Sequence, residues 1–205
     1  MKIGILGTGG MATSLGGSFV RAGHSVFLGG RRVEAAAAAA AAIGAAGHGD
    51  LSSAASYGEV LLVAVPPDAA PSLGGLLTGQ VVVDCTNPLG ADLMLTLPPG
   101  DSVTRRLASA APGARVVKAF NLCHASVWTM SPPVFEGAPL VVPFCGDPAA
   151  TAAMTALIRS MGCVPADCGG LDRAAYLEAT AALAIGIWFG GGQARAAFPS
   201  GPDRN

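Results

Sequence analysis

Short apolar runs rich in β-branched residues alternate along the chain with longer, alanine-rich stretches, and this alternation limits the choice of fold. Near-continuous apolar runs are typical of strands buried on both faces of a parallel sheet. The intervening stretches are long enough for helices. The sequence therefore predicts right-handed βαβ crossovers and a doubly wound α/β fold with a parallel sheet. The expected strands cover residues 2–7, 25–29, 59–65, 80–85, 114–120 and 139–146, and helices are expected over 10–22, 33–42, 149–161 and 172–189.

A glycine-rich turn follows the first expected strand. The segment GILGTGGMA places Gly7, Gly9 and Ala12 in the pattern G-x-G-x-x-A, directly before a helix. In such a turn the first glycine permits the tight bend, the second lets the backbone approach a pyrophosphate, and the small third residue lets the helix pack closely on the strand. The free N–H groups of the helix N-terminus attract phosphate. This context predicts a dinucleotide-binding Rossmann domain, and the alternative is a glycine turn needed only for packing.

The residue that contacts the ribose of the dinucleotide is expected after the second strand, roughly 20 residues beyond the glycine turn. An acidic residue there would favour NAD, but this chain has Gly30, Arg31 and Arg32. Arginine offers a planar fork of donors to phosphate oxygens, Gly30 leaves room, and Thr8 adds a hydroxyl. The sequence predicts that the cofactor is NADP(H), with Arg31 at the 2′-phosphate. Arg32 has two open assignments, stacking on adenine or pointing to solvent, and both arginines could instead be surface charges.

Composition excludes several other classes of protein. The 205 residues are 51% hydrophobic and only 12% charged, which is the opposite of a disordered chain. A net charge of −1 without a basic block gives no indication of nucleic-acid binding. The five cysteines are an odd number in a chain too large for a disulfide scaffold, so reduced thiols in the cytoplasm are expected. Neither a signal sequence nor a membrane-spanning segment is expected, and no metal site is expected because Cys163 and Cys168 stand alone.

Four segments in this order, GILGTGGMA, LGGRR, VVVDCTNPL and VVKAFN, resemble the NADPH-dependent reductases of the coenzyme F420 family, which includes the F420H2:NADP oxidoreductases. The resemblance extends from residue 1 to about residue 189. It implies a Rossmann domain with a small C-terminal helical part, packed as a homodimer. It also implies direct hydride transfer between C4 of the nicotinamide and C5 of the deazaflavin F420, with no metal and no covalent nucleophile.

The resemblance also implies roles for individual residues. Gly30 stands where some family members have a serine that holds the 2′-phosphate together with an arginine. The continuation after VVKAFN, Leu122-Cys123-His124, also departs from the common family pattern. The positions carried over are Thr8, Gly9, Gly10 and Met11 for the pyrophosphate, Gly30 and Arg31 for the 2′-phosphate, Val65 and Pro66 for the adenosine side, and Asn87, Pro88, Ala119 and Asn121 for the nicotinamide end.

Two titratable residues near this end have open roles. His124 is a candidate proton donor to a carbonyl or imine, because histidine titrates near neutrality; the alternative is a histidine packed at a helix start. Lys118 is a candidate catalytic lysine or a structural charge at a strand end. Besides F420 reduction, two functions stay open: reduction of a small imine, ketone or flavin-like metabolite, and non-catalytic sensing of NADP(H).

The sequence divides into an NADP-binding domain over 1–169 and a C-terminal part over 170–205. The expected helix over 172–189 is apolar on most faces, and a helix of this kind is normally buried. We therefore expect it to form a homodimer interface that includes Trp188. The last ten residues, AAFPSGPDRN, are expected to be poorly ordered.

Overall fold

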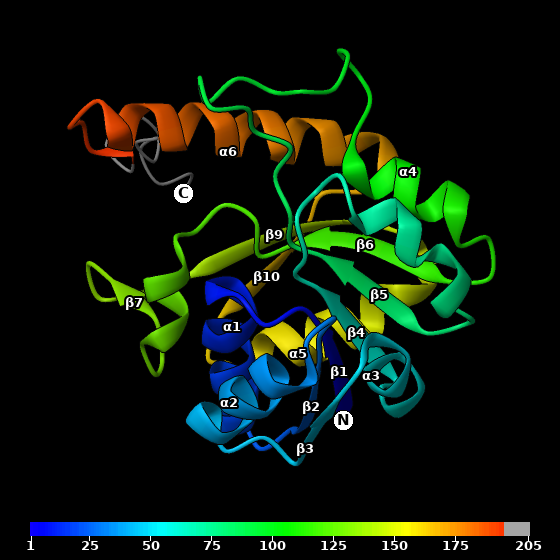
Figure 1. The fold of residues 1–205 in the computed structure, drawn as a ribbon. Helices are drawn as coiled ribbons and strands as arrows, with labels where there is room; N and C mark the ends of the chain where they lie inside the picture. Colours follow the sequence, from blue (N-terminus) through cyan, green and yellow to red (C-terminus); the bar gives the residue numbers. More distant parts are fainter. Residues whose placement is uncertain (195–205) are drawn as a thin grey trace.

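The computed structural model describes residues 1–194 and is built around one eight-stranded sheet (Figure 1). The predicted tail over 196–205 lies outside the described residues. The strand order is β10-β9-β6-β5-β4-β1-β2-β3, and the doubly wound α/β prediction is confirmed. The strands are β1 (Lys2–Leu6), β2 (Ser25–Gly29), β3 (Gly47–Gly49), β4 (Val60–Val63), β5 (Val81–Asp84), β6 (Arg115–Ala119), β9 (Val141–Gly146) and β10 (Val164–Asp167).

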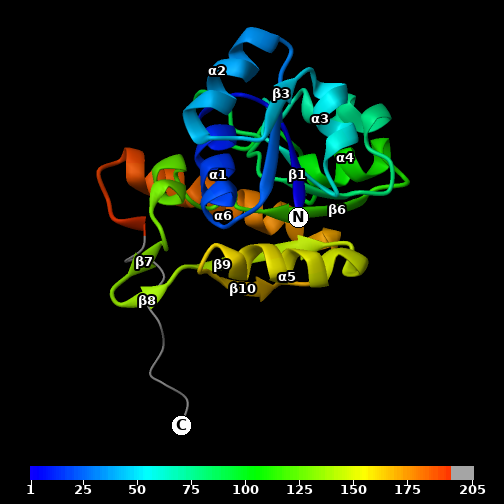
Figure 2. The same ribbon diagram turned by 90° about the horizontal axis from the view of Figure 1, so that it is seen from below.

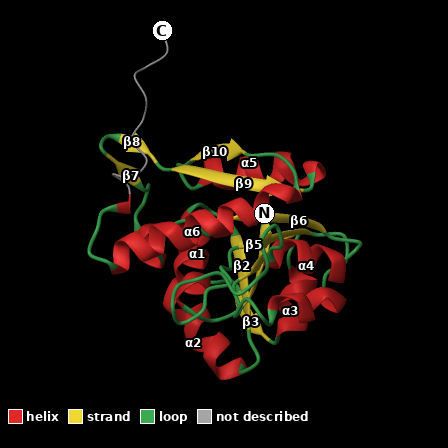
Figure 3. Ribbon diagram, turned by 90° about the horizontal axis from the view of Figure 1, so that it is seen from above, coloured by secondary structure: helices red, strands yellow, loops and turns green. Residues whose placement is uncertain are grey.

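Helices cover both faces of the sheet, as Figures 2 and 3 show. The apolar core on one face includes Leu15 and Phe19 of α1 together with Met154 of α5. The core on the other face includes Leu73 and Leu107. The first layer contains α1 (Gly10–Arg21), α2 (Val33–Ile43) and α5 (Thr151–Ser160), and the second contains α3 (Leu51–Tyr57), the 3₁₀ helix η1 (Ala70–Leu76) and α4 (Val103–Ala110).

Two strands depart from the predicted parallel arrangement. β9 pairs with β6 in the antiparallel sense, and β10, which is parallel to β9, runs in the same reversed direction at the edge of the sheet. After β6 the chain passes through the 3₁₀ helix η2 (Ala125–Thr129) and the hairpin of β7 (Val134–Phe135) and β8 (Ala138–Pro139). No helix in this connection returns the chain to the amino-terminal end of the sheet, so β9 runs back from the carboxyl end.

The last described helix, α6 (Ala174–Phe189), follows the short 3₁₀ helix η4 (Leu171–Arg173) and spans the top of the molecule in Figure 1. The helix predicted over 172–189 is thus confirmed, with its first residues in η4. The start of α6 packs through Ala174 and Leu177 against Cys145 of β9. This contact brings α6 over the carboxyl ends of β5 and β6.

Candidate functional site

A cleft of about 610 Å³ opens at the carboxyl ends of the strands. The chain leaves β1 towards β2 and β3, then returns to β4 on the other side of β1. Such a switch point is where open α/β sheets bind ligands. The lining residues come from the ends of β1, β2, β4 and β5 and the segments after them: Gly7, Thr8, Gly9, Gly10, Met11, Gly30, Arg31, Leu51, Ala64, Val65, Pro66, Pro67, Ala69, Ser72, Leu73, Cys85, Thr86 and Asn87.

The glycine turn forms one wall of the cleft. Gly7 has φ of +134°, and a Cβ atom there would lie 2.2 Å from the carbonyl oxygen of Ala64, so only glycine fits. A Cβ atom on Gly9 or Gly10 would meet nothing within 4 Å. Gly9 is the N-cap of α1, no side chain caps this helix, and its first turn has no acidic residue. The helix N-terminus is therefore left for an anionic ligand.

The two arginines lie at the end of β2, as predicted. Arg31 and Arg32 are both exposed, and with Thr8 they line a second hollow of about 380 Å³ that continues from the cleft. Neither arginine forms an ion pair with a described residue. A Cβ atom on Gly30 would approach Cγ2 of Thr8 to 2.8 Å, so a side chain at position 30 would have to displace the Thr8 methyl group. The Arg32 side chain is exposed, and its two assignments, stacking on adenine or pointing to solvent, both stay predictions.

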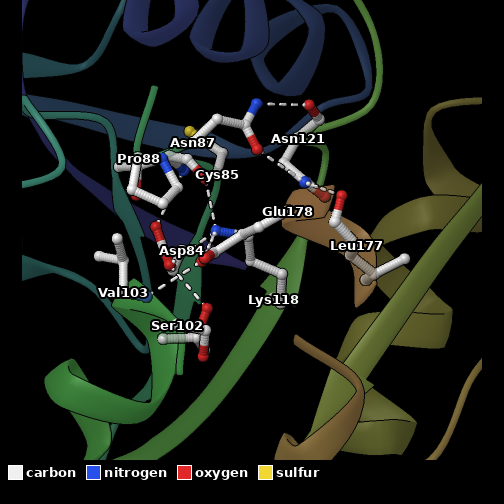
Figure 4. A network of polar contacts seen from close by, with 12 residues as sticks. Asp84, Cys85, Asn87, Pro88, Ser102, Val103, Lys118, Asn121, Leu177 and Glu178 are labelled. Atoms are coloured by element: carbon white, nitrogen blue, oxygen red, sulfur yellow. Dashed lines mark hydrogen bonds and ion pairs between the residues drawn. The ribbon is translucent and has the colours of Figure 1, made fainter. Parts of the chain in front are cut away.

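At the other end of the cleft the lining residue Asn87 is paired with Asn121, which is buried and does not itself line the cleft (Figure 4). The side-chain amide of Asn87 donates to the backbone carbonyl of Asn121 over 2.8 Å, and the amide of Asn121 donates to Oδ1 of Asn87 over 2.9 Å. Asn121 also donates to the carbonyl of Leu177 in α6 over 3.0 Å. Oδ1 of Asn121 and Oγ1 of Thr86 are buried without a hydrogen-bond partner among the described residues. Unpaired buried polar atoms are costly, so a ligand with both donor and acceptor groups is expected here.

Beneath the asparagines lies a buried cluster of charges (Figure 4). The ammonium of Lys118 is 3.0 Å from Oδ2 of Asp84 and 2.8 Å from Oε1 of Glu178, and all three side chains are at most 1% exposed. Lys118 also donates to the backbone carbonyl of Thr86. Thr104 donates to Asp84 over 2.7 Å. Of these three residues only Lys118 can be singled out in the sequence, because Asp84 ends an apolar run and Glu178 lies in a distant helix.

Burial and charge act against each other on these groups. Burial raises the pKa of Glu178, and the positive charge of Lys118 only partly offsets that effect. Burial alone would lower the pKa of Lys118, but the charges of Asp84 and Glu178 outweigh burial and raise it. Lys118 is therefore a permanent ammonium near neutral pH rather than a proton donor or an amine nucleophile.

Some of the predicted site residues do not line the cleft. Ala12 and Ala119 are fully buried, and Pro88 is also buried. Ala12 has the packing role that its place in the turn predicted. His124 is the N-cap of η2: its Nδ1 atom accepts from the backbone N–H of Ser126 and lies 2.9 Å from the Ser126 hydroxyl. Its ring centroid is 5.1 Å from that of Trp188. The structure thus places His124 at a helix start, exposed and beside Trp188, and its role as a proton donor stays a hypothesis.

The cysteines give no indication of a reactive thiol. All five are free, and none of them is paired in a disulfide. Cys85 lines the cleft, but burial raises the pKa of its thiol to about 12, and the thiol donates to the carbonyl of Val63. A thiol must ionise to act as a nucleophile. Covalent catalysis by Cys85 is therefore disfavoured at neutral pH.

The described residues fit a phosphorylated dinucleotide. The cleft joins an uncapped helix N-terminus, two exposed arginines and unpaired polar atoms at its inner end. Among the described residues that line it, none is a carboxylate, so nothing there repels a 2′-phosphate. Fold and cleft together define a dinucleotide-binding protein of the Rossmann class. No helix within residues 1–194 is long and apolar enough to cross a bilayer.

Comparison with known proteins finds one family that matches the N-terminal part of the chain. Residues 2–88 match the family model described as "NADP oxidoreductase coenzyme F420-dependent". Over these residues the chain is similar to that family, in agreement with the resemblance seen in its motifs. The family description names NADP as the cofactor, which agrees with the lining of the cleft.

Three relatives extend the comparison beyond residue 88. The metalloreductase STEAP3 of Rattus norvegicus is 33% identical over 191 residues, which cover 91% of this chain and 38% of that protein. The chain thus spans well under half the length of this curated relative. A solved structure from Arthrobacter sp. FB24, provisionally described as an F420-dependent NADP reductase, has a TM-score of 0.82 at 26% identity and covers 95% of this chain and 96% of its own. The reductive aminase of Aspergillus terreus, solved with NADPH4, has a TM-score of 0.68 at 19% identity over 93% of this chain and 62% of its own, which shows a shared fold alone.

The charge cluster yields a prediction on stability. A carboxyl whose pKa is raised by folding binds its proton more tightly in the folded state, so its ionised form destabilises the fold at high pH. This penalty fades as pH falls through the folded pKa towards the ordinary value of 4.5. We expect Glu178→Gln to raise Tm at pH 8, by about 2–4 °C for each kcal/mol gained, and the gain to shrink at pH 5.

Thermal denaturation followed by circular dichroism at both pH values measures this difference. Asp172→Asn is the matched control, because the Asp172 side chain is 90% exposed and its ion pair with Arg105 lies at the surface. It should show no pH-dependent gain. A lower Tm for Glu178→Gln at pH 8 would contradict the expected penalty.

Proposed function

We propose that this chain transfers hydride between NADP(H) and the deazaflavin coenzyme F420. The observation that carries the proposal is the pair of exposed arginines, unpaired within the described residues, at the end of a cleft without a lining carboxylate. The family match over residues 2–88 supports both the cofactor and the acceptor. The similarity to the Arthrobacter protein supports the acceptor further.

The residues of the chain act by binding and positioning. When bound, NADPH supplies the hydride from C4 of its nicotinamide. The glycine turn and the N-terminus of α1 hold the pyrophosphate, and Arg31 with Thr8 holds the 2′-phosphate. Val65 and Pro66 form the wall on the adenosine side. Asn87 and Asn121 meet the polar edge of the nicotinamide, and the fold excludes water from that end.

Replacement of Arg31 tests the choice of cofactor. Arg31→Ala should weaken NADPH binding by about 1.5–3 kcal/mol, the range for a hydrogen bond to a charged group, which is roughly tenfold or more in Kd. NADH has no 2′-phosphate, so its binding should barely change. Fluorescence titration with both cofactors measures the effect. Arg159→Ala, an exposed arginine of α5 outside the cleft, is the control, and equal losses for NADPH and NADH would contradict the assignment of Arg31.

Anaerobic turnover tests the reaction itself. Mixing enzyme, NADPH and oxidised F420 should bleach the deazaflavin absorbance, because hydride adds to C5 of the ring and a proton from solvent completes the reduction. His124→Ala should slow the reaction by less than the roughly 10²–10⁴-fold typical of losing a general acid, since His124 caps η2 and does not line the cleft.

Other outcomes of this assay favour the rival functions. Intact NADPH binding without F420 turnover would contradict the proposal and favour a small imine, ketone or flavin-like acceptor. A large His124→Ala defect with such an acceptor would make His124 the proton donor. Binding of NADPH without turnover of any acceptor would favour a sensing module.

We propose that the protein forms a homodimer through α6. This helix exposes large apolar side chains, with Tyr176 64%, Leu183 57%, Trp188 52% and Phe189 68% exposed, and apolar patches of this kind mark interfaces. The C-terminal part over 170–205 then serves assembly while 1–169 binds the cofactor. Light scattering at roughly tens of micromolar should give twice the chain mass, as expected for a specific interface; Leu183→Glu should give monomers, whereas a monomeric wild type would contradict the proposal.

The free cysteines support a reducing compartment, and we propose the cytoplasm.

A further inference from the structure

Both polar backbone groups of Thr86 are held by buried charges. The N–H of Thr86 donates to Oδ1 of Asp84 over 2.9 Å, and its carbonyl accepts from the ammonium of Lys118. Thr86 lines the cleft and directly precedes Asn87. The residue that begins the nicotinamide end of the cleft is therefore fixed by charge-assisted hydrogen bonds, which are stronger than neutral ones.

Lys118 is itself held from two sides. Asp84 at the end of β5 and Glu178 in α6 both contact its ammonium, and Glu178 also accepts from the backbone N–H of Val103 over 3.1 Å at the start of α4. The ammonium has three acceptors and three protons to donate, so its hydrogen-bonding capacity is filled. The ammonium of Lys118 is thus held at the Thr86 carbonyl by β5 and α6 directly, and by α4 through Glu178.

Stability alone gives a weak reason for this cluster. Well-packed apolar residues in place of a buried ion pair are often neutral or stabilising. Here two carboxyl groups and one ammonium are enclosed together, and burial raises the pKa of one of these carboxyls, Glu178. The cluster costs desolvation free energy, yet it holds both backbone polar groups of the cleft residue Thr86. It is therefore better explained by the geometry that it imposes on Thr86.

We propose that Lys118 is a positioning residue for hydride transfer: by fixing the Thr86 carbonyl, its ammonium sets the place of Thr86 and Asn87 against the nicotinamide. This inference rests on the proposed NADP(H)-dependent reaction. Oγ1 of Thr86 and Oδ1 of Asn121, both buried and unpartnered within the described chain, are the atoms that this placement presents to the ligand. A carboxamide, which has one donor group and one acceptor, matches that pair.

The test removes the donor together with one of the two buried carboxylates that contact it. Lys118→Met/Glu178→Gln deletes the ammonium and neutralises one carboxylate, while Asp84 keeps its contacts with Thr104 and the Thr86 N–H. The single Glu178→Gln variant, which retains Lys118, is the reference from which the effect of Lys118 is measured. Asp172→Asn is the surface control from the same C-terminal segment, and it should behave as wild type.

Three quantities separate positioning from a merely structural role. We expect the Kd for NADPH to stay within about threefold of the reference, because the phosphate-binding groups lie at the other end of the cleft. The fluorescence emission of bound NADPH, which reports the surroundings of the nicotinamide, should shift towards that of free NADPH. Single-turnover hydride transfer should fall by about 10- to 100-fold, the scale of a displacement near 1 Å.

A folded double variant with the emission and hydride-transfer rate of the reference would overturn the proposal. So would a parallel loss of NADPH affinity and rate, because that pattern indicates collapse of the whole cleft. Should the double variant fail to fold, Lys118→Gln/Glu178→Gln, which keeps a shorter polar side chain, is measured in the same way. If wild type does not reduce F420, the proposed reaction fails, but binding and emission still decide the role of Lys118.

Discussion

The close approach of Gly7 to Ala64 is the constraint on which the cleft depends. It places the turn after β1 directly against the end of β4, at the one point in the sheet where the chain changes direction across β1. A side chain at position 7 would push the turn away and tilt α1 with it. The uncapped N-terminus of α1, the open backbone of Gly9 and the contact between Thr8 and Gly30 all follow from this placement.

The half of the cleft that is proposed to bind phosphate could be singled out in the sequence, because its signals are local. Gly7, Gly9 and Arg31 each have a role that follows from backbone freedom or charge at a fixed distance along the chain. The antiparallel β9 was not foreseen, since an apolar run predicts a strand and not its direction. β3 was missed because the segment Gly47–Gly49 contains no apolar side chain.

The nicotinamide half depends on contacts between residues far apart in the sequence. Lys118 could be singled out, but its partners Asp84 and Glu178 lie 34 and 60 positions away. A carboxylate in an alanine-rich helix predicts an exposed face, and only the packing of α6 over β5 and β6 turns it inward. The contact between His124 and Trp188 of α6 likewise joins distant parts of the chain, whereas the cap of η2 by His124 is a local contact with Ser126.

The switch point between β1 and β4 has a consequence for folding. One wall of the cleft comes from the unit β1-β2-β3 and the other from β4 and β5, and in the sheet these units meet only along the β1–β4 ladder. A dinucleotide bound in the cleft contacts both units and so stabilises their association across the β1–β4 ladder. Ligand at about 100 times its Kd stabilises a fold by about 2.7 kcal/mol. Slow hydrogen exchange along β1 and β4 should therefore depend on the supply of cofactor, which couples the lifetime of the protein in the cell to its nucleotide pool.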